Sequence, residues 1–473
     1  MSKTDLALLS IAELSRLFRT RKLSPVELTN YFLARIERLN PTLNAYLTAT
    51  PELALAQARK AESELCAPRG SKSRRDRGPL HGIPISLKDN IHTAGIRTTA
   101  GAKFLNEFVP EKDADIVTRL KSAGAIILGK TNLHEFAYGV TSNNPHYGPT
   151  RNPWDTARIP GGSSGGAAAA IAAGLCVAAI GTDTGGSIRI PASLCGVVGF
   201  KPTLRRVSVE GIVPLSPTLD CVGPLARSVE DAALLLDAVF ENHKGEPPLL
   251  SALSSRGKKK LTLGIPKEFF FDVLSTEAQA SFESALKVLR KRGLAIREIS
   301  IPLLHETEKA GNDIAWAEAT HYHQKMGWFP KYSADYGEDV RARLEIGTRV
   351  TATTYLEALE LREKFIAQFH SALAEAKVDA LAVPTTPIPA PLIGEESTTI
   401  NAKDHATRAL LLRLNRPANL AGVPAISIPC GLSPSGLPLG LQLIGPNSSE
   451  SPLISISRAL EDSIPSIGHP VHA

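Results

Sequence analysis

Two glycine-rich segments, each containing serine, lie close together in this chain. Residues 161–166 read Gly-Gly-Ser-Ser-Gly-Gly, and residues 181–189 read Gly-Thr-Asp-Thr-Gly-Gly-Ser-Ile-Arg. Glycine costs conformational entropy, and it is needed where the backbone takes φ > 0 or approaches another group closely. Two glycine pairs beside serines therefore predict loops whose backbone N–H groups surround a ligand.

The segment between these loops predicts that they meet. Residues 167–174 are rich in alanine and predict a helix, and the apolar residues 175–180 predict a strand. A helix of this length travels roughly 12 Å, and a strand of this length returns roughly 20 Å. The second loop therefore comes back to the sheet edge where the first began, so Ser163 and Ser187 can share one site.

Other interpretations fit these loops less well. A phosphate-binding loop needs a lysine after its glycines, which neither segment has. A nucleophile elbow would use Ser164 within Gly-x-Ser-x-Gly, but it requires a preceding strand, which residues 158–160 do not predict. A glycine-rich bend that only packs a helix against a sheet would explain one loop alone, and the second loop makes it much less favourable.

Lys88 directly follows the short apolar strand predicted over residues 83–87. In open α/β sheets, the carboxyl ends of strands are where ligands bind, although a lone lysine there more often simply reaches solvent. Serine needs a base, and neither loop contains histidine; a buried, neutral lysine can serve. We therefore expect Lys88 as base, Ser163 as proton relay, Ser187 as nucleophile and Gly185 and Gly186 as oxyanion donors.

Composition is that of an ordinary globular enzyme, with 43% hydrophobic and 21% charged residues among 473. No apolar run reaches the roughly 18 residues of a membrane span, and no signal peptide is evident. The five cysteines are scattered, which indicates reduced thiols. We therefore expect a cytoplasmic protein.

Neither nucleic acid nor metal is indicated by the residues themselves. The net charge of +6 concentrates in two short basic runs, residues 69–77 and 256–260, which predict solvated loops. His321 and His323 form a His-x-His pair with no further ligand nearby in the sequence. We expect no metal and no cofactor.

The motifs together resemble those of the amidase signature hydrolases. The resemblance rests on Lys88, the two serine loops and three further segments, namely His-Gly-Ile-Pro (81–84), Gly-Lys-Thr-Asn (129–132) and Asn-Leu-Ala-Gly (419–422). It extends over nearly the whole chain. It implies an α/β protein with the amidase signature fold, a single α/β/α domain with a large twisted mixed sheet between helical layers.

This domain is expected to span residues 1–473. Residues 1–65 would form amino-terminal helices, 78–230 would hold the catalytic motifs, and 241–260 would form a surface connection. Residues 261–473 would complete the sheet and provide the helices of the substrate pocket.

The resemblance also implies a Ser–cis-Ser–Lys triad. Ser187 would be the nucleophile, Ser163 the relay next to a cis peptide bond, and Lys88 the base. The oxyanion hole would consist of the backbone N–H groups of Thr184, Gly185, Gly186 and Ser187. Ser164, Asp183 and Arg189 would support the triad, and Tyr138 and Gly139 would line the substrate pocket.

We expect the chain to hydrolyse amide C–N bonds through a Ser187 acyl-enzyme, preferring aryl or alkyl amides, with carbamates and esters as further substrates. Its partners would be small-molecule amides or carbamates, without nucleic acid or membrane, and it would be a monomer or homodimer. The alternative is a glutamine-hydrolysing component of a tRNA-dependent amidotransferase.

The choice between these functions depends on Leu412. In that glutamine-hydrolysing component, an aspartate that holds the substrate ammonium precedes the Asn-Leu-Ala-Gly segment, and Leu412 stands at its position here. Arg343 is a loose match for the arginine that binds the carboxylate. Leu412 and the nearby Leu410, Leu411 and Leu414 predict an apolar pocket wall that suits aryl or alkyl groups.

Overall fold

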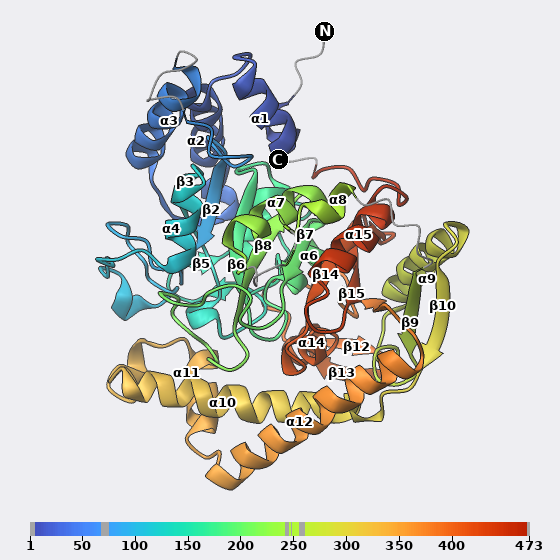
Figure 1. The fold of residues 1–473 in the computed structure, drawn as a ribbon. Helices are drawn as coiled ribbons and strands as arrows, with labels where there is room; N and C mark the ends of the chain where they lie inside the picture. Colours follow the sequence, from blue (N-terminus) through green and yellow to red (C-terminus); the bar gives the residue numbers. More distant parts are fainter. Residues whose placement is uncertain (1–4, 68–74, 242–245, 247, 255–260, 471–473) are drawn as a thin grey trace.

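An eleven-stranded mixed sheet runs through the computed structural model (Figure 1), which describes residues 5–67, 75–241, 246, 248–254 and 261–470. In chain order its strands are β1 (Tyr46–Ala49), β2 (Pro84–Lys88), β3 (Ile126–Thr131), β6 (Ala178–Asp183), β7 (Val198–Lys201), β8 (Cys221–Ala226), β9 (Thr262–Pro266), β10 (Ala295–Ile299), β11 (Ala380–Pro384), β14 (Ala425–Leu432) and β15 (Pro438–Ile444). Their spatial order is β1-β3-β2-β6-β8-β7-β14-β15-β11-β9-β10. Two small hairpins lie outside it, β4 (Asn143–Asn144) with β5 (Gly148–Pro149) and β12 (Ser397–Ile400) with β13 (Lys403–Ala406).

Helices surround this sheet in the described residues. They are α1 (Ile11–Arg19), α2 (Pro25–Leu43), α3 (Pro51–Cys66), α4 (Asp115–Ser122), α5 (Gly165–Ala172), α6 (Arg189–Cys195), α7 (Val229–Val239), α8 (Ser251–Ser254), α9 (Thr276–Lys291), α10 (Thr307–Lys325), α11 (Glu338–Gly347), α12 (Ala352–Glu375), α13 (Thr407–Arg413), α14 (Arg416–Leu420) and α15 (Glu450–Glu461). Short 3₁₀ turns are η1 (Leu6–Leu8), η2 (Lys103–Leu105), η3 (Glu135–Ala137), η4 (Pro302–Glu306) and η5 (Ser333–Asp335).

The first two α-helices begin where their capping signals predict. Ser10 and Glu13 exchange side-chain and backbone hydrogen bonds across the first turn of α1. Ser24 and Glu27 do the same for α2, with Pro25 at the first helical position. These bonds satisfy N–H groups that a helix start leaves without partners. Both helix starts thus follow directly from the local sequence.

The helices form layers around the sheet. Helices α5 and α6 pack together against the middle strands, and α7 packs with α15. Helices α10 and α12 cross beside each other at the bottom of Figure 1, at one end of the sheet. The expected α/β fold, with a large mixed sheet between helical layers, is confirmed.

Strand direction at β2 and β6 positions the site. These strands are parallel neighbours, with Leu87 paired to Ile180, so their carboxyl ends meet at one edge. Every residue of both strands is buried. A parallel strand covered on both faces needs a nearly continuous apolar run, which fits residues 178–180 at the start of β6; residues 175–177 of the predicted strand precede it. Lys88 and Asp183 are the last residues of these two strands.

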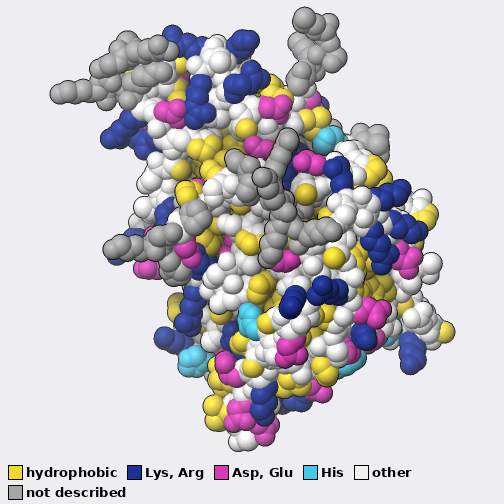
Figure 2. Space-filling view, turned by 45° about the vertical axis from the view of Figure 1, so that its right-hand side comes forward, with side chains coloured by type: hydrophobic (Ala, Val, Ile, Leu, Met, Phe, Trp, Pro, Cys, Tyr) yellow, Lys and Arg dark blue, Asp and Glu magenta, His cyan; other side chains and the backbone are white. Residues whose placement is uncertain are grey.

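Two sequence predictions fall partly outside the described residues. Residues 68–74 and 255–260 contain most of the two basic runs, and residues 242–245, 247 and 255–260 belong to the expected surface connection. On the face in Figure 2, Lys and Arg side chains are interspersed with Asp and Glu. Among the described helices, none combines the length and apolarity needed to cross a bilayer.

The burial of two leucines predicts very different losses of stability when each is replaced by alanine. Leu225 lies on β8 at 0% exposure, whereas Leu356 lies on α12 at 57% exposure. Leu225→Ala should lower the free energy of unfolding by about 2–5 kcal/mol, because it opens a cavity. Leu356→Ala should change it by less than about 0.5 kcal/mol. Urea denaturation followed by circular dichroism measures both, and equal losses would contradict this packing.

Candidate active site

The two serine loops meet at the shared edge of β2 and β6. Ser163 lies just before α5, and Ser187 lies between β6 and α6. The Ser164 N–H donates to the Ser187 carbonyl oxygen at 3.1 Å, which joins the loops directly. The peptide bond between Gly162 and Ser163 is cis. The helix and strand between the loops thus return the chain to its starting point.

Lys88 connects these loops to the sheet. Its Nζ donates to Ser163 Oγ at 2.7 Å and to Thr182 Oγ1 at 2.7 Å. Its side chain is fully buried. Burial lowers the pKa of Lys88 to about 7, although the carboxylates of Asp183 and Asp220 act in the opposite direction. The amine is therefore substantially neutral near neutral pH and can accept a proton.

A buried ion pair shapes the second loop. Arg189 Nη2 lies 2.9 Å from Asp183 Oδ1, and Arg189 Nε donates to Oδ2 at 3.0 Å. Burial alone would raise the pKa of Asp183, but the charge and hydrogen bonds of Arg189, together with Lys201 and Asn419, outweigh burial and hold that pKa well below its ordinary value. The pair is further held by side chains on distant elements, namely Asn419, which bonds both partners, and Gln442, which accepts from Arg189.

Asp183 also decides which N–H groups are available for an oxyanion. Gly186 N–H donates to Asp183 Oδ1 at 2.8 Å, so this predicted oxyanion donor already has a carboxylate acceptor. The N–H groups of Thr184, Gly185 and Ser187 make no hydrogen bond to any described residue. These three are therefore the free donors of the loop.

Ser164 is engaged with the backbone of β6. Its Oγ donates to the Thr182 carbonyl at 3.2 Å and lies 3.4 Å from the Thr182 nitrogen. No strand precedes it within the described residues 150–164, as a nucleophile elbow requires. Ser187 Oγ, in contrast, makes no hydrogen bond with the described side chains or backbone and lines a cavity. This arrangement favours Ser187 over Ser164 as the reactive hydroxyl.

The cavity at Ser187 contains the two predicted pocket residues, Tyr138 and Gly139. Other lining residues come from well-separated parts of the chain: Ala137, Val140, Thr184, Gly185, Leu215, Gly311, Ala315, Arg408, Leu412 and Arg416. No Asp or Glu is among these lining residues. The site thus combines three hydroxyl or phenol groups, loop N–H groups and two arginines.

The predicted leucine wall is only partly present. Leu412 lines the cavity and also belongs to an apolar cluster with Leu410 and Leu411, which do not line it; Leu414 belongs to the main core. Successive helical residues point about 100° apart, so a leucine run cannot face one cavity. Arg343 is not among the lining residues; its guanidinium carbon lies 5.2 Å from the Tyr138 ring centroid.

Sequence reasoning missed Thr182, Asp220, Arg408 and Arg416. Thr182 accepts the second hydrogen bond of Lys88. Its position near the carboxyl end of β6, just before the second serine loop, could have identified it from the sequence. Asp220 accepts from Thr184 Oγ1 at 2.5 Å and from the N–H groups of Leu215 and Ser216, so it ties the Thr184 side chain to the neighbouring segment. The arginines had no local signal, because they approach Ser187 only through the fold.

No group of three His, Cys, Asp or Glu side chains among the described residues is arranged to hold a metal ion. The His-x-His pair has a packing role for one member: His323 is buried, and its Nδ1 lies 2.7 Å from Tyr336 Oη. Its ring contacts Phe136 edge-on, with centroids 4.5 Å apart.

Comparison with known proteins corrects the expected partners. The A subunit of glutamyl-tRNA(Gln) amidotransferase from Carboxydothermus hydrogenoformans is 38% identical over 97% of this chain and 97% of its own. The same-named protein of Geobacter metallireducens is 40% identical, with 96% of each chain covered. The prediction of small-molecule partners only, without nucleic acid and as a monomer or homodimer, is wrong, because the name of these relatives denotes one component of a tRNA-dependent assembly. Composition could not reveal this, since net charge does not locate a binding surface.

Two solved structures and one family profile also match this chain over most of its length. A crystal structure of an amidase matches with a TM-score of 0.87 and 34% identity, covering 96% of this chain and 100% of that one. The A subunit of glutamyl-tRNA(Gln) amidotransferase from Thermotoga maritima matches with a TM-score of 0.79 and 35% identity, covering 98% and 97%. The profile of the family described as Amidase matches residues 27–454. With Lys88, Ser163 and Ser187 gathered at one sheet edge, this chain belongs to the amidase family.

Proposed function

We propose that this chain cleaves the C–N bond of a carboxamide through an acyl-enzyme on Ser187. The observation that carries the proposal is the buried Lys88 Nζ, 2.7 Å from Ser163 Oγ, beside the loop that bears Ser187. Neutral Lys88 accepts the Ser163 proton while Ser163 accepts the Ser187 proton. Ser187 Oγ then bonds to the carbonyl carbon.

The remaining steps use the same groups in reverse. The carbonyl oxygen becomes an oxyanion, which the N–H groups of Thr184, Gly185 and Ser187 stabilise. The proton returns through Ser163 to the departing nitrogen, the C–N bond breaks, and ammonia or an amine leaves. Water then attacks the Ser187 ester, gives its proton to the same relay and releases the carboxylic acid. Asp220 holds the Thr184 side chain and so maintains the loop geometry.

For the biological role, we propose the amide-hydrolysing component of a tRNA-dependent amidotransferase, with glutamine as nitrogen donor. Relatives of that name, 37–40% identical over nearly their full length, support it. The arginines of the cavity, which suit the carboxylate of glutamine better than an aryl group, also support it.

A second candidate is a hydrolase of carboxamides that lack an ammonium group. Leu412 favours it, because this side chain lines the cavity at the position where the resemblance places an ammonium-binding aspartate. Burying an ammonium without an acidic partner is costly.

Ser187→Ala should lower kcat at least about 1,000-fold, because it removes the nucleophile. Ser193→Ala is the matched control: this buried serine lies on α6, and its hydroxyl contacts Thr386. Steady-state assays with circular dichroism on both variants make the comparison. A fluorophosphonate adduct on the Ser187 peptide supports the assignment, whereas undiminished turnover by Ser187→Ala refutes it.

The pH dependence should report Lys88. Activity requires the neutral amine, so kcat/KM should rise with pH through about 7. An unperturbed lysine would give a rise near about 10.4. Lys88→Arg should be inactive across this range, because arginine keeps its proton. A profile without a rise between about pH 6 and 8 would exclude Lys88 as the base.

The role can be tested with three amides on one preparation. We expect kcat/KM for glutamine to exceed that for glutaramate, which lacks only the α-ammonium, and that for a nitroanilide. Ammonia or nitroaniline release provides the measurement. Faster cleavage of glutaramate would favour the second candidate, and faster cleavage of the nitroanilide would restore the aryl-amide prediction.

A further inference from the structure

Two arginines line the Ser187 cavity without a carboxylate partner among the described residues. Arg416 Nη1 donates to the backbone oxygen of Glu308 at 3.1 Å and to Asn312 Oδ1 at 2.5 Å, both neutral acceptors. Arg408 makes no hydrogen bond or ion pair with any described residue, and its Nε is buried. Guanidinium groups in a confined site are costly unless an anion compensates them. The cavity therefore favours a negatively charged ligand.

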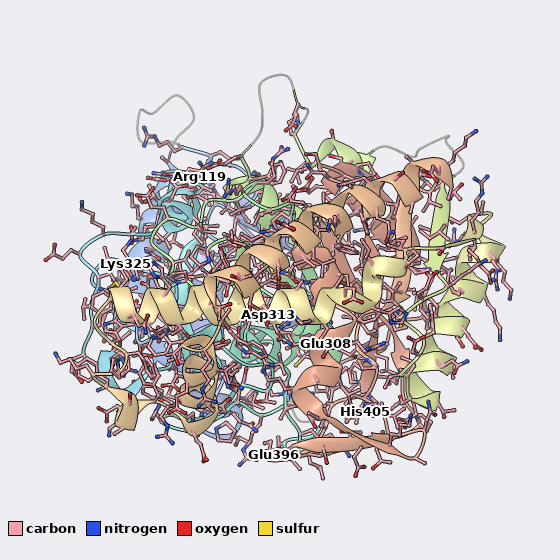
Figure 3. The ribbon with its side chains drawn as sticks, turned by 90° about the horizontal axis from the view of Figure 1, so that it is seen from below. Arg119, Glu308, Asp313, Lys325, Glu396 and His405 are labelled. Carbon is pink, nitrogen blue, oxygen red and sulfur yellow. The ribbon has the colours of Figure 1, made fainter. Side chains whose placement is uncertain are left out.

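Nearby acids pair with other arginines. In the view from below, α10 crosses the middle of the molecule with Glu308 at its start (Figure 3). The Glu308 carboxylate lies 3.8 Å from Arg413 Nη1, and neither residue is part of the cavity lining. Asp339 pairs with Arg343 and with His134. Thus Arg343 already has its counter-ion, whereas Arg408 and Arg416 have none among the described residues.

Tyr138 adds a third donor to the arginines. It is 2% exposed, lines the cavity, and its Oη has no hydrogen-bond partner among the described residues. Burial raises the pKa of Tyr138 to about 12, so the hydroxyl stays protonated and can donate. Burial, and then the charges of Arg343 and Arg416, lower the pKa of Arg408 to about 9, which leaves it cationic at neutral pH.

We propose that Arg408, Arg416 and Tyr138 bind a carboxylate of the substrate, so that the preferred substrate is an amide bearing a carboxylate group. The inference rests on the proposed amide hydrolysis by Ser187. It assigns the carboxylate to Arg408 and Arg416 instead of Arg343, which Asp339 neutralises. Glutamine and the monoamides of dicarboxylic acids both belong to this class.

The test compares glutaramate with pentanamide, which has a methyl group in place of the carboxylate. Wild-type kcat/KM should favour glutaramate by about 10- to 100-fold, the range expected for hydrogen bonds to a charged group. Arg408→Gln should remove most of this preference, chiefly by raising KM for glutaramate. Arg413→Gln, on the same helix but outside the cavity lining, is the matched control and should keep it.

Equal rates for the two wild-type substrates would overturn the proposal, as would an unchanged ratio in Arg408→Gln. Arg408→Lys should restore part of the preference, because it keeps the charge but loses the planar fork.

A binding measurement separates this inference from the proposed function. Calorimetric titration with glutarate needs no turnover. If the wild type and Arg413→Gln bind glutarate, and Arg408→Gln binds it at least about 10-fold more weakly, the carboxylate site stands even when no amide is hydrolysed. If wild-type protein does not bind glutarate, the carboxylate site is refuted, whatever the fate of the hydrolase assay.

Discussion

The Asp183–Arg189 ion pair is the interaction on which the site depends. It spans the loop that carries Ser187, and its two members start from different elements, the end of β6 and the beginning of α6. Breaking one partner of a buried pair costs about 3–5 kcal/mol, because the other charge stays behind without compensation. Asn419, which lies far along the chain from both members, bonds each of them and so helps to set the shape of this loop. The local geometry of the Ser187 loop is therefore a property of the whole sheet.

Much of the geometry of the candidate site was predictable because it is encoded locally. Lys88 stood at the end of an apolar strand, and Ser163 and Ser187 lay in glycine-rich loops separated by one helix and one strand. Strand direction and element length then decided where these residues meet. Arg408 and Arg416 could not be predicted in this way, since they reach the cavity only through the packing of α13 and α14. The leucine run illustrates the same limit, because helical geometry placed only Leu412 of this run at the cavity, while the other leucines pack into the apolar clusters beneath it.

The sequence was a poorer guide to the binding partners than to the candidate catalytic side chains. Catalysis requires particular side chains within hydrogen-bond distance, and such side chains leave motifs. An interface with another macromolecule requires only a complementary surface. A charged loop that is merely solvated and a charged loop that binds a partner can have the same residue types, so the sequence does not distinguish them. The relatives overturn the expectation of small-molecule partners only, which charge patterning could not do.

The cavity draws part of its walls from regions of the chain that take no part in the proposed proton relay. Gly311 and Ala315 belong to α10, and Arg408 and Arg416 belong to short helices near the carboxyl end, whereas Lys88, Ser163 and Ser187 all lie in the first half of the sequence. A side chain added on α10 would reshape the cavity without touching Lys88 or the serine loops. Substitutions in the second half of the gene can therefore alter substrate preference while the first half stays unchanged. In a protein built this way, new specificities can evolve without any intermediate that has lost Lys88 or the serine loops.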